Sequence, residues 1–437
     1  MQALRRTSLR RLTPAVPAVE QRSLTTKTLD VVKATLPAVA EAGPAFTAHF
    51  YKRMFKAHPE LLNTFNIVNQ RAGRQQKSLF SAIAASATSV LNHGTLPLDL
   101  LEGVNHKHCA LNVVPAQYDV VGEHILGSIT EMLNPGQEVL DAWGELYGAL
   151  AGHCIEREEE IYKEVESLAG GWRGLRSFKI VEKTVQSDVI TKFTFAPVDG
   201  KPVCTFSPGQ YTTLWLHPES WPNRQPRHYS LISDPCTQTY SIAVKKEQQG
   251  LMSSHLHDNV AVGDLVDLSP PYGNFTLSGC DKLWTDHVDS PVVLMSAGVG
   301  ITPMLGMLGT MKSGSTPQSR PVVWLHAAKN GREHAFRNYI VGLARAHPDD
   351  LTRRVWYEAP TPEDMQGTSN NCAYHFEGLM DLAKVKSLLP LGDSAAQYFF
   401  CGPAPWMKSV GKQLLDLNVD RDSLHFEAFS PNEDILP

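Results

Sequence analysis

One histidine lies at a position where helical spacing predicts a buried side chain. Leu101, Val104 and Leu111 mark one face of a predicted helix over residues 98–111. His108 falls on that face, between Val104 and Leu111. A buried imidazole requires a polar partner. It is either a core histidine that is hydrogen-bonded to the protein or a ligand to an iron cofactor held between helices, and this stretch alone leaves both interpretations open.

A carboxylate interrupts the apolar face of a later helix. After residues 134–136 (Asn-Pro-Gly), apolar residues recur at helical spacing from Leu140 to Val165, but Glu158 occupies one of the apolar positions. Burying a carboxylate is unfavourable unless it is paired or hydrogen-bonded. Glu158 therefore either reaches the rim of the core or meets a partner inside it, and periodicity does not decide between the two.

Two further polar side chains share helix faces with apolar residues. Tyr51 lies on the apolar face of the helix that begins at Pro44, so its hydroxyl should lie near the core and need a partner. Gln75 opens the next helix and shares a face with Leu79. Phe65 lies in the short polar link between these two helices.

Two turns near the end of the chain predict a nucleotide-binding edge. The turn at residues 298–303 (Gly-Val-Gly-Ile-Thr-Pro) follows an apolar strand and opens a helix, which is the context that a dinucleotide pyrophosphate requires. The turn at residues 401–403 (Cys-Gly-Pro) ends another strand of the same predicted sheet. Each turn alone could be structural, but both belong to the carboxyl edge, where ligands of open α/β sheets bind.

A polar run precedes the nucleotide turn. Residues 227–230 (Arg-His-Tyr-Ser) begin a predicted strand after a proline-containing loop. An arginine can bind a pyrophosphate, and the tyrosine and serine beside it can stack on and hydrogen-bond an isoalloxazine ring. The run is short, but Tyr211 precedes it after a Gly-Gln pair, and Gly250 and Ser253 follow the next strand.

The elements that must position these residues fall into three regions. Helical periodicity runs from Thr28 to a linker at 169–172, with a break expected at Gly43-Pro44. From Arg176 the period changes to two, which predicts short strands of an antiparallel barrel. From Pro291 strands alternate with helices, which predicts a parallel sheet with helices on both faces. The last region should contain strands at 291–295, 321–327, 353–358, 396–401 and 423–429, and helices from 303 and near 334–346, 379–389 and 404–417.

Composition narrows the class of protein. A chain of 437 residues is long enough for about two or three domains, and its net charge of −5 gives no indication of nucleic-acid binding. The seven cysteines are scattered without a C-x-x-C pair, which predicts free thiols in a reducing compartment. No run approaches the roughly 20 apolar residues of a membrane-spanning helix. Since no heptad pattern is present either, we expect a monomer.

The N-terminus departs from this even composition. Residues 1–24 contain five arginines, several serines and threonines, and a single acidic residue, Glu20. This composition resembles a mitochondrial transit peptide. The alternative is a disordered basic tail on a cytoplasmic protein.

The order of the motifs carries a family resemblance. An Arg-x-Tyr-Ser run, then Gly-x-Gly-x-x-Pro, then Cys-Gly-Pro resembles the ferredoxin reductase superfamily, and a globin-like helical region in front of it resembles the flavohaemoglobins, the nitric oxide dioxygenase family. Residues 47–51 (Thr-Ala-His-Phe-Tyr), 136–144 (Gly-Gln-Glu-Val-Leu-Asp-Ala-Trp-Gly) and 377–381 (Glu-Gly-Leu-Met-Asp) match that family almost as written. The resemblance covers residue 28 to the end of the chain.

This resemblance implies a multidomain protein that binds haem b, FAD and NADH or NADPH. After the leader at 1–24, which the composition predicts, its parts would be an all-α globin domain at 25–168, an antiparallel β-barrel FAD domain at 169–283 and an α/β NAD(P)-binding domain at 284–437. The implied reaction oxidises nitric oxide with dioxygen at the haem iron to give nitrate. Two alternatives are a flavin-driven reductase of other acceptors and a haem sensor of oxygen or nitric oxide.

The family's residue roles carry over by motif. His108 would be the proximal iron ligand, with Phe65 packed on the haem face. Tyr51, Gln75 and Leu79 would line the distal pocket, where the phenol would hydrogen-bond dioxygen. Tyr118 and Glu158 would orient the proximal imidazole. The implied FAD-binding residues are Tyr211, Arg227, His228, Tyr229, Ser230, Gly250 and Ser253. The implied nucleotide-binding residues are Gly298, Val299, Gly300, Ile301, Thr302, Pro303, Cys401, Gly402 and Pro403.

One segment departs from the family pattern. The family usually reads Cys-Phe-Gly-Pro near its C-terminus, whereas this chain has Ala-Phe-Ser-Pro at 428–431. Phe429 is retained as the aromatic residue at the flavin, so the resemblance implies the same cofactor with altered local geometry.

Overall fold

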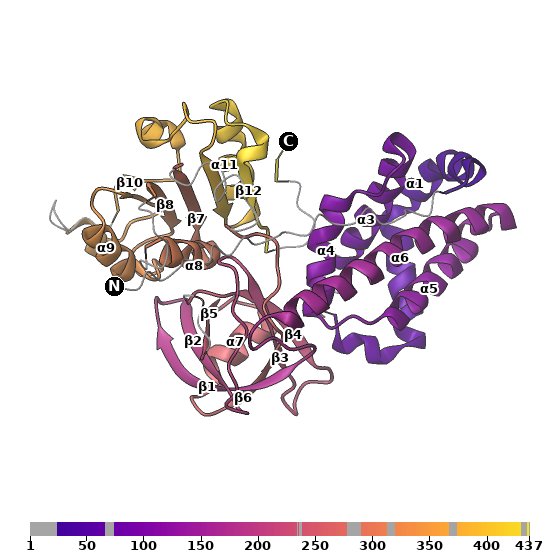
Figure 1. Cartoon of the computed structure of the whole chain (residues 1–437), viewed down its shortest axis with the longest axis horizontal. Helices are drawn as coiled ribbons and strands as arrows, with labels where there is room; N and C mark the ends of the chain where they lie inside the picture. Colours follow the sequence, from indigo (N-terminus) through magenta and orange to yellow (C-terminus); the bar gives the residue numbers. More distant parts are fainter. Residues whose placement is uncertain are drawn as a thin grey trace, which may run out of the picture.

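Three parts follow one another along the chain (Figure 1). The computed structural model describes residues 24–65, 74–233, 235, 238–277, 290–312, 320–366, 374–429, 435 and 436, without the side chains of Pro44 and residues 74–78. The leader predicted at 1–24 therefore lies outside the described residues, apart from Leu24. A helical part comes first, an antiparallel sheet second, and a parallel sheet flanked by helices last.

The helical part packs around one apolar core. Its elements are α1 (Thr26–Ala57), η1 (Pro59–Asn63), α3 (Arg74–His93), α4 (Leu98–Ala110), α5 (Pro115–Leu133) and α6 (Gln137–Ser167). The break predicted at Gly43-Pro44 is confirmed as a kink that separates two helical stretches of α1. Gly43 leaves the helical angles (φ 8°, ψ −94°), and the following proline lacks the N–H of a helical hydrogen bond. Both halves of α1 pack on the same apolar core.

The second part is a six-stranded antiparallel sheet. Its strands are β1 (Arg176–Val185), β2 (Ile190–Pro197), β3 (Tyr211–Leu216), β4 (Gln225–Ser230), β5 (Tyr240–Lys245) and β6 (Leu265–Leu268), with α7 (Leu251–Asp258) after β5. They are hydrogen-bonded in the order β4-β3-β6-β1-β2-β5. A single bridge between Leu231, directly after β4, and Ile242 in β5 brings the two edge strands together, which agrees with the barrel-like architecture that the spacing predicts.

The third part is a six-stranded parallel sheet in the order β10-β9-β8-β7-β11-β12. Its elements are β7 (Val292–Ala297), η3 (Gly298–Gly300), α8 (Ile301–Lys312), β8 (Val322–Ala328), α9 (Arg337–Ala346), β9 (Leu351–Tyr357), α10 (Pro362–Met365), β10 (Phe376–Glu377), η5 (Leu382–Leu388), β11 (Gln397–Cys401), α11 (Ala404–Asp416), η6 (Arg421–Ser423) and β12 (Leu424–Phe426).

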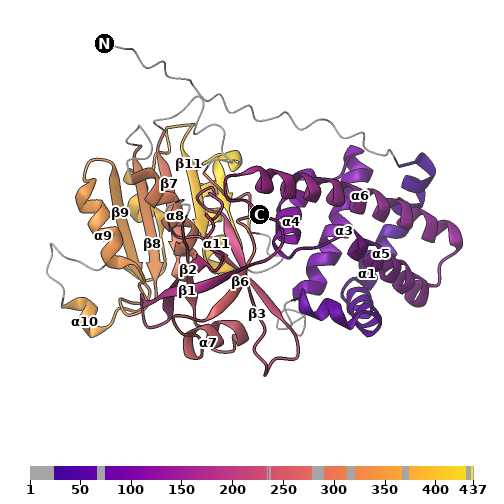
Figure 2. The same cartoon turned by 60° about the horizontal axis from the view of Figure 1, so that its bottom comes forward.

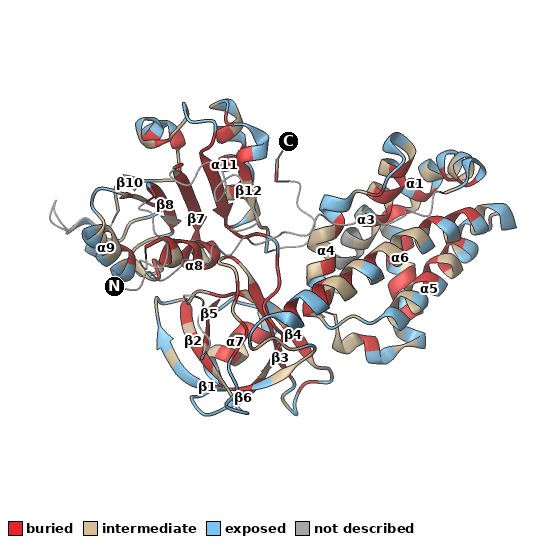
Figure 3. Ribbon diagram, in the orientation of Figure 1, coloured by how far each residue is buried: buried red, intermediate tan, exposed pale blue. Residues whose placement is uncertain are grey.

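Both faces of this sheet are covered, and its central strands are buried (Figure 3). Val292 and Leu294 pack with α8 and α9, and the alternate residues Val293 and Met295 pack with η5 and α11. Two predicted elements are shorter than expected. The helix predicted at 379–389 is the 3-10 helix η5, which begins only after Asp381 because that carboxylate caps the amide of Ala383. The strand predicted at 423–429 extends only over β12.

Helix α4 lies on the side of the helical part that faces the two sheets, as Figures 1 and 2 both show. Cys109, the residue after His108 on α4, packs with Tyr211 of β3, so His108 is close to the boundary between the helices and the antiparallel sheet. None of the helices in the described part of the chain is long and apolar enough to cross a membrane.

Candidate functional site

Three helices bring His108 together with two other polar side chains. The imidazole Nδ1 lies 2.9 Å from Glu158 Oε1 on α6 and 2.7 Å from the Tyr118 hydroxyl on α5. The Tyr118 hydroxyl also donates to Glu158 Oε1. Glu158 is only 3% exposed, so this carboxylate points inward and is paired there. The structure thus joins the two residues whose spacing was unusual.

This arrangement sets the chemistry of the imidazole. Because the carboxylate accepts from Nδ1–H, the proton resides on Nδ1 and the lone pair remains on Nε2. Nε2 forms no hydrogen bond with any described residue. Burial, followed by the nearby Cys154 and Glu158, raises the pKa of Tyr118 above its usual range, so the phenol stays a neutral donor. A histidine with a free Nε2 and a carboxylate on Nδ1 fits a basic ligand to iron.

The predicted distal residues lie in the apolar core of the helical part. Tyr51 is 6% exposed, and its ring lies 5.8 Å from Phe65 and 5.6 Å from Phe55 between centroids. Leu79 packs on the same cluster from α3, and so does Tyr118. Gln75 lies in the first turn of α3, but its side chain is outside the described residues. An apolar cluster that contains the buried phenol of Tyr51 and lies against Tyr118, the partner of His108, fits a haem plane.

Strand pairing assembles the candidate flavin site. Tyr211 on β3 lies opposite Ser230 on β4, and its ring centroid is 4.9 Å from that of His228. Alternation along β4 places His228 and Ser230 on one face and Arg227 and Tyr229 on the other.

Two side chains of this region have polar groups that remain available to a ligand within the described part of the chain. The Tyr211 hydroxyl is buried and forms no hydrogen bond with any residue that the structure describes, and burial raises its pKa well above the usual range. Arg227 is half-buried, and within the described chain it bonds only to the carbonyl of Pro226 and forms no ion pair. A neutral phenol donor and an unpaired guanidinium fit the ring and the pyrophosphate of FAD, respectively.

Gly250 and Ser253 shape the start of α7. A Cβ at Gly250 would lie 2.2 Å from the Ser253 hydroxyl, which accepts from the amide of Glu247 at 3.1 Å. Only glycine therefore fits this turn without a shift of its neighbours. Phe429, three residues after β12, is 49% exposed. Ser430 and Pro431, which complete the altered family segment, lie outside the described residues.

The two predicted nucleotide turns meet at the carboxyl edge of the parallel sheet. Ser296 in β7 pairs with Cys401 in β11, so the turns that follow these strands are neighbours. A Cβ at Gly300 would lie 2.2 Å from the carbonyl oxygen of Cys401, and Gly298 has a φ of +55°. These glycines leave the amides at the start of α8 open to a phosphate.

The remaining residues of these two turns fix the backbone of the turns by hydrogen bonding and packing. Thr302 donates to the carbonyl of Val299 at 3.0 Å, and Ile301 and Pro303 are buried in the first turn of α8. Gly402 lies against Trp406, since a Cβ there would approach the indole to 2.7 Å, and Pro403 is the N-cap of α11.

Two charged residues near this junction were missed by the sequence motifs. Burial raises the pKa of Glu427 to about 7, and Lys107, the neighbour of His108, opposes that shift. After burial, the charge of Glu427 is the next cause that raises the pKa values of Tyr211 and Cys401. Its charge therefore acts on residues of the flavin strand and the nucleotide turn, and the charge of Lys107 on the proximal helix acts on it. An acidic residue directly after the short β12 was the available signal, but it matched no motif.

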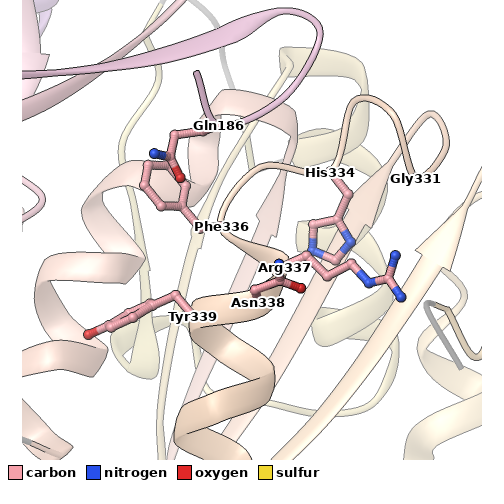
Figure 4. Close-up of a pocket in the computed structure, with 7 residues that line it drawn as sticks. All are labelled: Gln186, Gly331, His334, Phe336, Arg337, Asn338 and Tyr339. Carbon is pink, nitrogen blue, oxygen red and sulfur yellow. The ribbon is translucent and has the colours of Figure 1, made fainter. Parts of the chain in front are cut away.

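A cavity of about 270 Å³ lies beside the carboxyl end of β8, between the β1–β2 turn and the start of α9 (Figure 4). Its polar and aromatic lining includes Gln186, His334, Phe336, Arg337, Asn338 and Tyr339. Phe336 packs in a cluster that also contains Val299 of the nucleotide turn. The cavity therefore adjoins the nucleotide edge and is remote in sequence from the helical site. No motif in the sequence predicts it.

Comparison with known proteins agrees with this three-part organisation. A globin family model matches residues 48–154, an oxidoreductase FAD-binding domain matches residues 177–277, and an oxidoreductase NAD-binding domain matches residues 294–412. These matches confirm the predicted fold class and the predicted cofactor types.

Two solved structures extend the comparison. A flavohaemoglobin from Malassezia yamatoensis, crystallised with FAD and haem, is 27% identical with a TM-score of 0.82, and the alignment covers 93% of this chain and 100% of that one. The FAD/NAD-binding domain of a nitric oxide dioxygenase from Vibrio cholerae is 34% identical with a TM-score of 0.50, over 59% of this chain and 99% of that domain. With a globin domain, both oxidoreductase domains and these relatives, the chain belongs to the flavohaemoglobin family.

Proposed function

We propose that this protein is an NAD(P)H-dependent nitric oxide dioxygenase. The observation that carries the proposal is the buried Glu158–His108–Tyr118 arrangement, because a carboxylate on the proximal imidazole favours redox chemistry over oxygen storage. The similar FAD/NAD-binding domain from Vibrio cholerae, which belongs to a nitric oxide dioxygenase, supports the same activity.

Each part of the chain has a role in this proposal. When bound, FAD and haem would pass electrons from NAD(P)H to the iron, where dioxygen would convert nitric oxide to nitrate. His108 would hold the iron through Nε2, and Glu158 would keep the proton on Nδ1. The Tyr51 hydroxyl would donate a hydrogen bond to dioxygen within a cluster whose apolar rings exclude water.

The flavin and nucleotide parts would bind and align the donors. Arg227 and the start of α7 would hold the pyrophosphate of FAD, and Tyr211 and Ser230 would contact its ring system. The turn at 298–303 would hold the pyrophosphate of NADH or NADPH, with Cys401 beside it.

The experiment that tests this proposal removes the iron ligand. In His108→Ala, haem content and nitric oxide consumption should both be lost, while NADH-driven reduction of a soluble dye should continue because the flavin part is intact. A matched His93→Ala substitution, at the exposed end of α3, should change neither haem content nor nitric oxide consumption. Nitric oxide consumption that survives in haem-free His108→Ala would instead favour a flavin-driven reductase.

We also propose that residues 1–24 direct the protein to mitochondria and that it acts as a monomer. The arginine-rich, acid-poor composition supports the first proposal. Import of a fusion of residues 1–24 with a reporter into isolated mitochondria would test it. A fusion that stays outside would place the protein in the cytoplasm.

A further inference from the structure

A buried cluster joins the helical part to the antiparallel sheet, separate from the core of either. Cys109 and Ala110 at the end of α4 and Tyr162 on α6 pack in it with Tyr211 and Tyr272 of the flavin part. Tyr272 is 1% exposed and Tyr162 is 7% exposed. The helix that carries His108 therefore contacts the flavin strand through a closed apolar layer.

The segment Tyr272-Gly273 is bound tightly to the flavin strand. Tyr272 exchanges two backbone hydrogen bonds of 2.9 Å with Tyr211. Gly273 has a φ of +115°, and a Cβ there would lie 2.9 Å from the ring of Tyr211. Tyr272-Gly273 therefore cannot shift without also shifting Tyr211, the aromatic residue assigned to the flavin.

The same segment makes a polar contact with α4. The amide of Gly273 donates to Nδ1 of His106 at 3.2 Å. On its other side, His106 Nε2 lies 3.4 Å from Glu102 Oε1, and Arg157 on α6 donates to both oxygens of Glu102 at 2.9 and 3.0 Å. This chain of contacts fixes the tautomer of His106, with Nδ1 as the acceptor. The middle of α4 is thus held against Gly273.

Tyr162 holds the end of α4 by hydrogen bonding and contacts the ring of Tyr272. The Tyr162 hydroxyl donates to the carbonyl oxygens of Val113 at 3.2 Å and Cys109 at 3.4 Å, where α4 ends. Its ring stands at 87° to that of Tyr272, 6.3 Å away between centroids. Tyr162 is one helical turn after Glu158, so α6 holds both the imidazole of His108 and the end of the helix that carries it.

We infer that Tyr272-Gly273 is a bracket that fixes α4 against β3, with His106 and Tyr162 as positioning residues for electron transfer from flavin to haem. The inference rests on the proposed function. With both cofactors bound, each transfer would move one electron from the flavin to the haem iron, and no atom would be exchanged. The rate of such a transfer depends on the distance and orientation between flavin and haem. The bracket would fix both, because it holds α4 against β3.

Tyr162→Phe tests the hydroxyl contact in the cofactor-loaded protein. In stopped-flow experiments with NADH, flavin reduction should keep its rate, and the following haem reduction should slow by about fivefold, as expected for one lost hydrogen bond. The matched control is Tyr398→Phe, since the Tyr398 hydroxyl is also buried but has no hydrogen-bond partner among the described residues. Tyr398→Phe should leave both phases unchanged.

Hydrogen exchange followed by mass spectrometry gives a readout that does not depend on turnover. Tyr162→Phe should speed exchange of the amides at 111–113, which bond to the last carbonyls of α4. His106→Leu should speed exchange of the Gly273 amide, and His106→Gln should restore protection because its amide oxygen can accept the same bond.

The outcomes separate the two proposals. If Tyr162→Phe and His106→Leu match Tyr398→Phe in haem reduction and in exchange, the bracket is wrong and the proposed function stands. Faster exchange without slower haem reduction would also overturn the positioning role. If the unmodified protein does not reduce its haem from NADH, the proposed function fails, and the inference with it.

Discussion

At the scale of single residues, the chemistry depends on how Glu158 holds the imidazole of His108. One oxygen of Glu158 receives bonds from both Nδ1 of His108 and the hydroxyl of Tyr118, inside the protein. A charge-assisted hydrogen bond to the remote nitrogen makes the other nitrogen a stronger donor to a metal. The oxygen of a neutral amide would be a weaker acceptor in the same place.

Glu158→Gln should therefore weaken the push of electron density to iron. We expect turnover to fall by about tenfold, as is typical when the partner of a metal-bound histidine is changed. The iron–histidine stretching frequency of the ferrous protein should fall as well, as measured by resonance Raman spectroscopy. Glu156→Gln, on the exposed side of the same helix, is the control. An unchanged frequency in Glu158→Gln would refute the proximal role of this carboxylate.

The role of a single residue could be predicted from the sequence only where a local pattern revealed it, because partners far apart in the sequence leave no local signal. The inward position of Glu158 conflicted with an apolar helix face, so the sequence already marked it as unusual. Its bond to Tyr118 joins residues 40 positions apart, which no local pattern reports, and that pairing came from the family resemblance. Glu427 and the His106–Gly273 contact were missed because each acquires its partners only through the packing of separate parts.

At the scale of elements, the active groups are held where helices or strands meet. Helices α4 and α6 are joined by Arg157, which binds Glu102 on α4 and Glu160 and Glu164 on its own helix. Burial acts to raise the pKa of Glu102, but hydrogen bonds from His106 and Arg157 outweigh it and hold that pKa at about 2.

This depressed pKa predicts how the link depends on pH. A carboxyl with a lower pKa when folded adds stability above its unfolded pKa of about 4.5 and loses it as pH falls towards about 2. The thermal midpoint of the helical part, followed by haem absorbance, should therefore be lower in Glu102→Gln at pH 7, and the difference should shrink below pH 4.5. A difference that stays constant across this range would contradict the ionised link.

The carboxyl edge of the parallel sheet gives a second test at this scale. Gly300→Ala would place a Cβ 2.2 Å from the Cys401 carbonyl and push the two nucleotide turns apart. Flavin reduction should then need much more NADH, with the FAD content unchanged. Gly342→Ala is the control, because nothing lies within 4 Å of a Cβ there and alanine favours a helix. Equal NADH dependence in the two variants would exclude the turn as the nucleotide site.

Sequence periodicity predicted element types better than element ends. The change from helical spacing to a period of two and then to alternation located all three parts. The break at Gly43-Pro44 agrees with the prediction, whereas η5 starts later than predicted because one capping carboxylate decides its first residue. Gly300 matched a short motif, but its close approach to Cys401 depends on the pairing of β7 with β11.

At the scale of the whole molecule, three parts with separate cores follow one another along the chain, and in the proposed function they would form one electron path. The parallel sheet offers a nucleotide edge, the antiparallel sheet places Tyr211 and Ser230 opposite each other, and the helices hold His108. Tyr272-Gly273 lies where the helical part meets the antiparallel sheet. This order matches the flow of electrons from NAD(P)H through flavin to haem that the family membership suggests.

The measurement that tests the central claim most directly is nitric oxide consumption at an electrode. The purified protein, loaded with haem and FAD, would receive NADH and air-level oxygen, and nitrate would be assayed afterwards. Our account predicts many turnovers, with nitrate formed in proportion to the nitric oxide lost. Loss of nitric oxide that stops once it is stoichiometric with haem, while NADH is still oxidised by other acceptors, would contradict the dioxygenase function.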